Sequence, residues 1–202
     1  KPWIDTARIK YTGWFRLAAD KPWMAIKAEQ VYTTNPPAFQ WHARFKMFGL
    51  WIVRARDTYR HGHGHMFGKV AGLISVFDAR GPEIDQGTML RYLNEMAWFP
   101  IALLSDYITW QAVDDHSFDV TFTDGGQSVT ARFVVDALGR LTNFITQRYR
   151  ESKGTYTLDR WETPMTEWGQ LGGLNLPICG QAVWKLPTGD LPYADLTITQ
   201  VE

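Results

Sequence analysis

The sequence predicts a mainly β fold, in which a curved antiparallel sheet or half-barrel of about 9–11 strands wraps around one long apolar helix. Apolar and polar residues alternate with a period of two through most of the chain, and Gly- and Pro-containing turns separate the alternating runs. One internal segment has helical spacing instead. The 202 residues suit one undivided β domain, so we expect residues 1–202 to form a single domain.

The N-terminal part predicts about four strands. Alternation is clearest from Phe39 to Met47, where apolar residues at odd positions face one side of a half-buried strand. Less regular patterns cover Ile9 to Leu17 and Met24 to Tyr32, and a fourth strand begins near Trp51. Residues 35–37, Asn-Pro-Pro, must separate the second strand from the third, because proline cannot donate to a strand ladder.

The helix is expected from Asp85 to about Leu104. Glu83 and Asp85 place negative charge where a helix N-terminus favours it, and Pro100 should kink or end the helix near Phe99. The apolar residues at helical spacing are Leu90, Leu93, Ala97, Ile101 and Leu104.

Alternation resumes after the helix and predicts about five more strands. A hairpin turn at residues 124–126, Asp-Gly-Gly, and another at Leu138-Gly139 join the first of them. These strands are expected at Phe118–Phe122, Val129–Val135 and Leu141–Arg150, with two last strands centred on Ala182 and Thr197. Residues 155–173 form a looser Gly- and Trp-rich stretch.

Composition excludes several classes of protein. The 21 basic residues balance 21 acidic ones, so no long-range field favours nucleic acid or an anionic bilayer. The single cysteine, Cys179, excludes an internal disulfide. The longest strongly apolar stretch, Met96–Leu104, is too short to cross a membrane. We expect a soluble domain but leave its compartment open, because the chain begins at Lys1 without a methionine: it is either cytoplasmic or, if an upstream segment has been removed, membrane-peripheral.

Aromatic residues are abundant, with 10 Trp, 11 Phe and 8 Tyr. They predict a thick aromatic core, which is either filled or opened into a ligand cavity.

Four groups of residues resemble a family of bacterial and archaeal domains of unknown function. The most specific is the helix motif RYLNE-x-x-WFP, which covers Arg91 to Pro100. The others are Tyr32 with Pro36-Pro37 and Trp41, the residues Asp57-x-Tyr59-x-x-Gly62-x-Gly64-x-Met66, and Trp184-Lys185-Leu186 with Gly189 and Pro192-Tyr193. The resemblance assigns no activity to any residue. The expected fold is similar to the concave half-barrel of bacterial lipoprotein carriers (LolA/LolB-like), which enclose acyl chains against a helix.

A candidate ligand site combines strand and helix residues. Asp57 shares strand parity with Trp51 and Tyr59, so this carboxylate faces an aromatic surface and needs a partner. Arg91, Glu95 and Trp98 follow at helical spacing on one side of the helix. We expect walls from Trp41, Tyr59 and Trp98, a polar floor of Asp57, Arg91 and Glu95, and an anionic head held by Arg91. Alternatively, Arg91 and Glu95 are a structural pair that fixes the helix to the sheet.

The string His61-Gly62-His63-Gly64-His65 offers a second site. On an unbroken strand the three imidazoles share one face with Asp57, a spacing that can hold zinc or copper and activate water. The two glycines instead indicate a bulge or loop, which would separate the histidines. The family pattern keeps Tyr59 and the glycines but not the histidines, so the resemblance implies no shared metal site.

The sequence therefore favours non-catalytic binding or carriage of a lipid-like, apolar or amphipathic small molecule, with no cofactor. The first alternative is a hydrolase, which uses either the histidines with a metal or Asp57 and Glu95 as an acid–base pair. The second is a structural module with a filled aromatic core. The sequence does not determine the oligomeric state.

Overall fold

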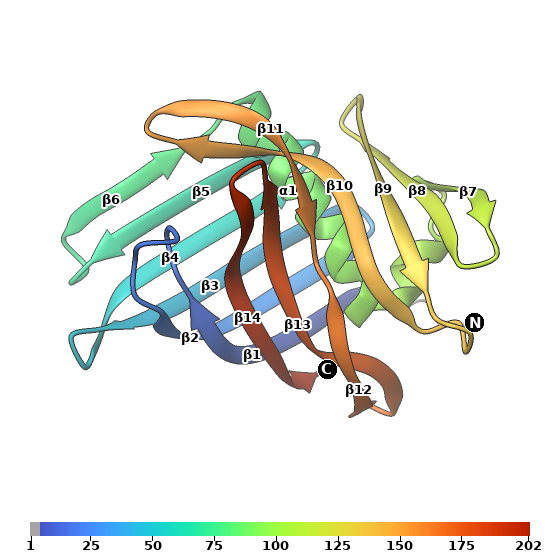
Figure 1. Cartoon of the computed structure of the whole chain (residues 1–202), viewed down its shortest axis with the longest axis horizontal. Helices are drawn as coiled ribbons and strands as arrows, with labels where there is room; N and C mark the ends of the chain where they lie inside the picture. Colours follow the sequence, from blue (N-terminus) through green and yellow to red (C-terminus); the bar gives the residue numbers. More distant parts are fainter. Residues whose placement is uncertain (1–4) are drawn as a thin grey trace.

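A computed structural model describes residues 5–202 as one 14-stranded antiparallel sheet with a single α-helix, α1 (Figure 1). The elements are β1 (Thr6–Phe15), β2 (Met24–Thr34), β3 (Pro37–Met47), β4 (Leu50–Arg60), β5 (His63–Val70), β6 (Ile74–Ala79), α1 (Pro82–Glu95), β7 (Ile108–Asp114), β8 (Ser117–Asp124), β9 (Gln127–Val135), β10 (Leu141–Ser152), β11 (Thr155–Glu162), β12 (Met165–Leu171), β13 (Leu174–Leu186) and β14 (Gly189–Val201). Two 3₁₀ turns, Met96–Trp98 and Pro100–Leu104, follow α1.

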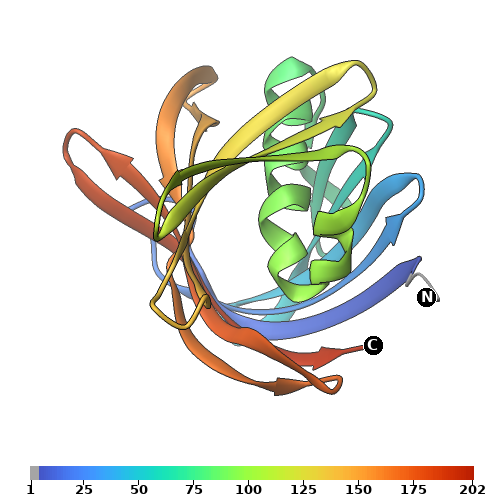
Figure 2. The same ribbon diagram turned by 90° about the vertical axis from the view of Figure 1, so that its right-hand side faces the viewer.

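The strands run in the order β6-β5-β4-β3-β2-β1-β14-β13-β11-β10-β9-β8-β7, and β12 pairs with β13 outside this path. Sequential hairpins build each half, and the pairing of β1 with β14 joins the two halves. The sheet curves into a half-barrel whose hollow holds α1, as Figure 2 shows. The expected half-barrel around a helix is therefore confirmed.

The helix is shorter and more polar than expected. α1 has 14 residues and ends at Glu95, whereas the prediction continued to about Leu104. Pro100 lacks an amide donor and disfavours helical geometry in the residue before it, and Phe99 accordingly has φ −138° and ψ 67°. The apolar residues predicted for the last helical turns lie in the 3₁₀ turns instead. Among residues 5–202, no helix is long and apolar enough to span a bilayer.

The predicted number of strands was too low. The chain from Trp51 to His65 forms two strands, because β4 ends at Arg60 and His61 occupies a turn with φ 51°. Strands β6 and β7 lie at the two edges of the sheet, where exposed residues blur the alternation used for prediction. The stretch 155–173, expected to be loose, contains β11 and β12.

The core lies between the concave face of the sheet and α1. In β3, the odd-numbered residues from Pro37 to Phe45 are buried, as the alternation predicts. The largest fully buried side chains are aromatic and include Tyr32, Tyr59, Tyr92 and Phe122. Tyr92 stacks obliquely against Tyr59 and Phe122 at ring centroid distances of 5.8 and 5.2 Å, which fixes α1 between the two halves of the sheet.

Candidate functional site

A cavity of about 500 Å³ lies between the concave face of the sheet and α1. This volume falls within the roughly 300–1,000 Å³ typical of small-molecule pockets. Strands from both halves of the sheet line it with apolar side chains, among them Phe15, Ile26, Phe45, Trp184 and Ile198. The aromatic core is thus not filled.

The mouth of the cavity has an apolar rim. Leu17, Val76 and Phe77 line the cavity and are also exposed to solvent. They come from the loop after β1 and from the edge strand β6. An apolar rim gives a non-polar molecule continuous contact from solvent to the interior.

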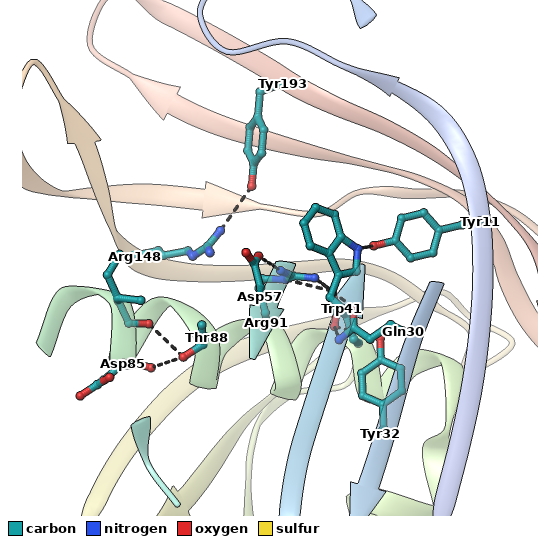
Figure 3. Close-up of polar contacts among 12 residues, drawn as sticks. Tyr11, Gln30, Tyr32, Trp41, Asp57, Asp85, Thr88, Arg91, Arg148 and Tyr193 are labelled. Atoms are coloured by element: carbon teal, nitrogen blue, oxygen red, sulfur yellow. Dashed lines mark hydrogen bonds and ion pairs between the residues drawn. The ribbon is translucent and has the colours of Figure 1, made fainter. Parts of the chain in front are cut away.

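Arg91 organises the polar floor of the cavity (Figure 3). Its guanidinium donates to Asp57 from β4 and, through Nε and Nη2 at 3.2 and 3.1 Å, to Oε1 of Glu95 one turn along α1. Nη2 also donates to Oε1 of Gln30 at 3.0 Å. The side chains of Arg91, Asp57 and Glu95 are only 13%, 3% and 8% exposed, so these charges are shielded from bulk water.

Both oxygens of Glu95 are fully engaged. Oε2 accepts from Gln30 Nε2 at 2.6 Å and from the Tyr32 hydroxyl at 2.9 Å, while Oε1 accepts from Arg91. Asp57 differs, because its Oδ1 is buried and has no hydrogen-bond partner among the described residues. Of these two carboxylates, Asp57 is therefore the one with an oxygen open to a new donor.

The two members of the Arg91–Asp57 ion pair respond differently to burial. Loss of solvation raises the pKa of Asp57 from 3.8 to about 6, and the nearby guanidinium groups of Arg91 and Arg148 only partly oppose this. The pKa of Arg91 rises despite its burial, because the carboxylates of Glu95 and Asp57 stabilise its charge. Burial also raises the pKa of Tyr11, whose hydroxyl accepts from the Trp41 indole.

Arg148 is a second buried arginine in the cavity wall. It extends from β10, with its guanidinium carbon 4.6 Å from the ring centroid of Trp161 and 5.8 Å from that of Trp184. Nη1 donates to the Tyr193 hydroxyl at 3.3 Å, a contact drawn in Figure 3. Its Nε has no partner among the described residues.

The predicted walls are only partly brought together. Trp41 and Trp98 line the cavity, and the Trp98 indole donates to the carbonyl of Pro177 at 3.1 Å. Tyr59 is buried outside the cavity lining, and its hydroxyl donates to Oδ2 of Asp124 at 2.6 Å. It ties the end of β4 to the turn between β8 and β9.

The three histidines do not converge. His61 lies in the turn after β4, His63 contacts Asp85 of α1 at 3.0 Å, and His65 contacts Asp78 of β6 at 2.8 Å. Across residues 5–202, no group of three or more His, Cys, Asp or Glu side chains could hold a metal ion. The turn at residues 61–62 divides the strand, so the arrangement in which His61, His63 and His65 share one face is not found, and the histidines are separated as the alternative interpretation of the glycines indicated.

Sequence reasoning missed Arg148, Gln30 and Tyr32 as residues of the polar cluster. A signal for Arg148 was present, since it shares strand parity with Phe144 and Thr146, and all three are buried. Gln30 and Tyr32 likewise share parity on β2. Their partners on α1 could not be identified without the tertiary arrangement.

Comparison with known proteins agrees with the helix motif and the fold. A profile of the family described as "Family of unknown function (DUF6544)" matches residues 1–196. No curated protein matches the chain.

Two solved structures share the fold. A DUF1329 family protein from Desulfovibrio piger aligns with a TM-score of 0.56 and 8% identity, over 98% of this chain and 85% of that protein. A LolA superfamily protein from Nitrosomonas europaea aligns with a TM-score of 0.50 and 9% identity, over 100% of this chain and 87% of that protein. The expected LolA-like fold is confirmed, and at these identities the likeness concerns the fold alone.

Proposed function

Because the chain belongs to the DUF6544 family, whose function is unknown, its activity has to be inferred from its geometry, and we propose that it binds and carries an apolar or amphipathic small molecule without chemical change. The observation that carries this proposal is the cavity of about 500 Å³ between sheet and helix. Its lining is mostly apolar, so burial of a hydrocarbon chain there is favourable, with a transfer free energy of about 25 cal/mol for each Å² of apolar surface removed from water.

The arrangement of polar groups supports binding more than catalysis. The exposed surface of the cavity is mostly apolar, and the buried charged side chains of Asp57, Arg91 and Arg148 lie near one another in its lining. Pockets of this kind use such groups to orient a ligand whose remainder is held by apolar contacts. The ligand would therefore be amphipathic, with its polar end at this cluster.

The hydrolase alternative would rest on Asp57 and Glu95 as an acid–base pair. Both carboxylates bind the guanidinium of Arg91, and the lone pairs of Glu95 are occupied by Arg91, Gln30 and Tyr32. A general acid or base needs a free oxygen within hydrogen-bond reach of its substrate, which Asp57 has at Oδ1 but Glu95 lacks, so the two carboxylates are not both available as a pair. The proposal of non-catalytic carriage therefore fits these contacts better.

A fluorescent binding assay tests the proposal. The full chain should bind the neutral apolar probe N-phenyl-1-naphthylamine with saturable, blue-shifted emission. The variant Ala182→Phe, which adds a ring to the cavity lining, should weaken this binding at least tenfold, whereas Ala112→Phe on the exposed strand β7 should not. Met24→Trp provides a second cavity-filling variant if Ala182→Phe does not fold.

Native mass spectrometry of the purified protein provides the complementary measurement. We expect a bound amphiphile that organic extraction releases with its mass unchanged. Absence of saturable probe binding, or equal binding by the cavity-filling and control variants, would contradict the proposed function. Recovery of a cleaved product from an added ester would favour the hydrolase instead.

A further inference from the structure

Arg148 is a buried cation near the Asp57 carboxylate but without an ion-pair contact of its own within residues 5–202. The residue is 8% exposed, and no carboxylate among the described residues forms an ion pair with it. Its one hydrogen bond goes to the neutral hydroxyl of Tyr193, and its Nε has no partner. A buried guanidinium is costly unless it is paired, so its presence in the cavity wall requires an explanation.

Arg91, by contrast, already donates from all three of its guanidinium nitrogens, through four of its five N–H groups. Its Nη1 donates to Asp57, its Nε to Glu95, and its Nη2 to both Glu95 and Gln30. Binding a ligand through Arg91 would break contacts that already compensate its charge. Arg148 is therefore the better candidate for the anion-binding role that the sequence suggested for Arg91.

Two indole rings lie beside the Arg148 guanidinium. Its central carbon lies over the rings of Trp161 and Trp184, 4.6 and 5.8 Å from their centroids, and the Trp161 indole donates to the same Tyr193 hydroxyl at 3.1 Å. Cation–π contacts stabilise the charge of a guanidinium without an anionic partner. The charge of Arg148 is thus partly compensated while its Nε remains without a hydrogen bond to any described residue.

The edge formed by Nε and Nη2 faces Gly87, which also lines the cavity. A Cβ added at Gly87 would lie 3.4 Å from Nε and 3.5 Å from Nη2, so a methyl group there would cover this edge. Glycine in the interior of a helix is unfavourable relative to alanine. The absence of a side chain at residue 87 leaves room beside this edge of the guanidinium.

From these observations we infer that Arg148 binds the head of the ligand, and that this ligand is an amphiphile with a single carboxylate. The inference rests on the proposed binding function and specifies its substrate class. The Nε–Nη2 edge matches a planar carboxylate through two parallel N–H···O bonds. A small rotation of the guanidinium over the Trp161 ring presents this edge to the cavity, while the hydrocarbon chain lies along the apolar lining.

The test compares cis-parinaric acid with its methyl ester, which differ in charge at the head. Energy transfer from tryptophan to the bound probe reports binding to the full chain. The wild type should bind the acid roughly 10- to 100-fold more tightly than the ester, the range expected for a charge-assisted contact. In Arg148→Met this preference should fall to about one, and Arg148→Lys, which keeps the charge but loses the planar edge, should retain part of it.

Gly87→Ala gives an independent test with little risk to the fold, since the added methyl meets Arg148 only at ordinary contact distances. The preference for the acid should fall roughly tenfold, without a decrease in the urea midpoint of unfolding. Arg132→Met is the matched control, because Arg132 lies outside the cavity and pairs with Asp119 at 2.9 Å. It should keep the wild-type preference.

The outcomes separate this inference from the proposed function. Binding of N-phenyl-1-naphthylamine and the ester without preference for the acid would overturn the role of Arg148 and leave the cavity function intact. A preference that survives in Arg148→Met and Gly87→Ala would also overturn it. Stronger displacement of cis-parinaric acid by hexadecyl phosphate than by palmitic acid would contradict the carboxylate assignment. Failure of all the probes to bind would contradict the proposed function itself.

Discussion

Replacing Arg91 with methionine should destabilise the protein strongly and in a pH-dependent manner. The substitution keeps an apolar side chain in the space between α1 and β4 but removes the cation bound to Asp57 and Glu95, which are 3% and 8% exposed. Breaking a buried ion-pair network by removing one partner costs about 3–5 kcal/mol. For a domain of this size, that loss lowers Tm by roughly 6–20 °C.

Urea unfolding followed by far-ultraviolet circular dichroism at pH 8 and pH 5 measures the effect. Without Arg91, the pKa of Asp57 should rise further above its present value of about 6. At low pH the Asp57 carboxylate of the variant is then protonated, and the free-energy cost of burying its negative charge disappears. The deficit relative to wild type should therefore be largest at pH 8 and smaller at pH 5.

The control for this experiment is Arg132→Met. Arg132 and Asp119 form a pair whose side chains are 44% and 27% exposed, so its loss should cost at most about 1 kcal/mol. An Arg91→Met variant that loses no more stability than this control, or loses the same amount at both pH values, would refute the idea that the cluster is buried and charged.

Three further predictions concern the same region. In the wild type, the pKa of Asp57 is raised from 3.8 to about 6, so this group stabilises the fold most below about pH 4. That contribution, up to about 3 kcal/mol, is lost as the pH rises through 6. Asp57→Asn should therefore flatten the dependence of stability on pH in urea titrations between pH 4 and pH 8. Asp85→Ala removes the acceptor of the 2.7 Å hydrogen bond from the Gly64 amide, and this should lower the free energy of unfolding by about 1–3 kcal/mol in the same urea titrations. Asp85→Asn keeps an acceptor oxygen, so a smaller loss of stability in Asp85→Ala than in Asp85→Asn would count against this role. Gly64→Ala would place a Cβ 2.3 Å from Oγ1 of Thr88 and 2.9 Å from the carbonyl oxygen of Ile84, so it should destabilise by about 1–3 kcal/mol, and an unchanged Tm would show that α1 can move away from β5.

Much of the fold follows from local patterns in the sequence. The alternation in β3 identifies its buried face, because successive side chains point to opposite sides of a strand. Pro100 marks where helical geometry cannot continue, since its ring acts on its immediate neighbours. The edge strands β6 and β7 were missed for the opposite reason, as most of their residues are exposed and burial imposes no period on them.

The candidate site divides in the same way. Arg91 and Glu95 are one helical turn apart, and Asp57 shares the parity of an aromatic strand face, so their association as a polar cluster could be predicted from the sequence. The environment of Arg148 could not be predicted, because it depends on β10, β11, β13 and α1 meeting around one side chain. Only the three-dimensional structure shows that all three guanidinium nitrogens of Arg91 are engaged while Nε of Arg148 has no hydrogen-bond partner in the described part of the chain.

The junction between β1 and β14 has a consequence for how the protein folds. Each half of the sheet forms from neighbouring hairpins, whereas this junction pairs Ile9 with Val201 and requires closure of nearly the whole described chain. Contacts of such high sequence separation form slowly. Tyr11 of β1 and Ile198 of β14 both line the cavity, so a molecule bound as proposed would contact both halves of the sheet. Its binding should then slow amide hydrogen exchange most along this junction.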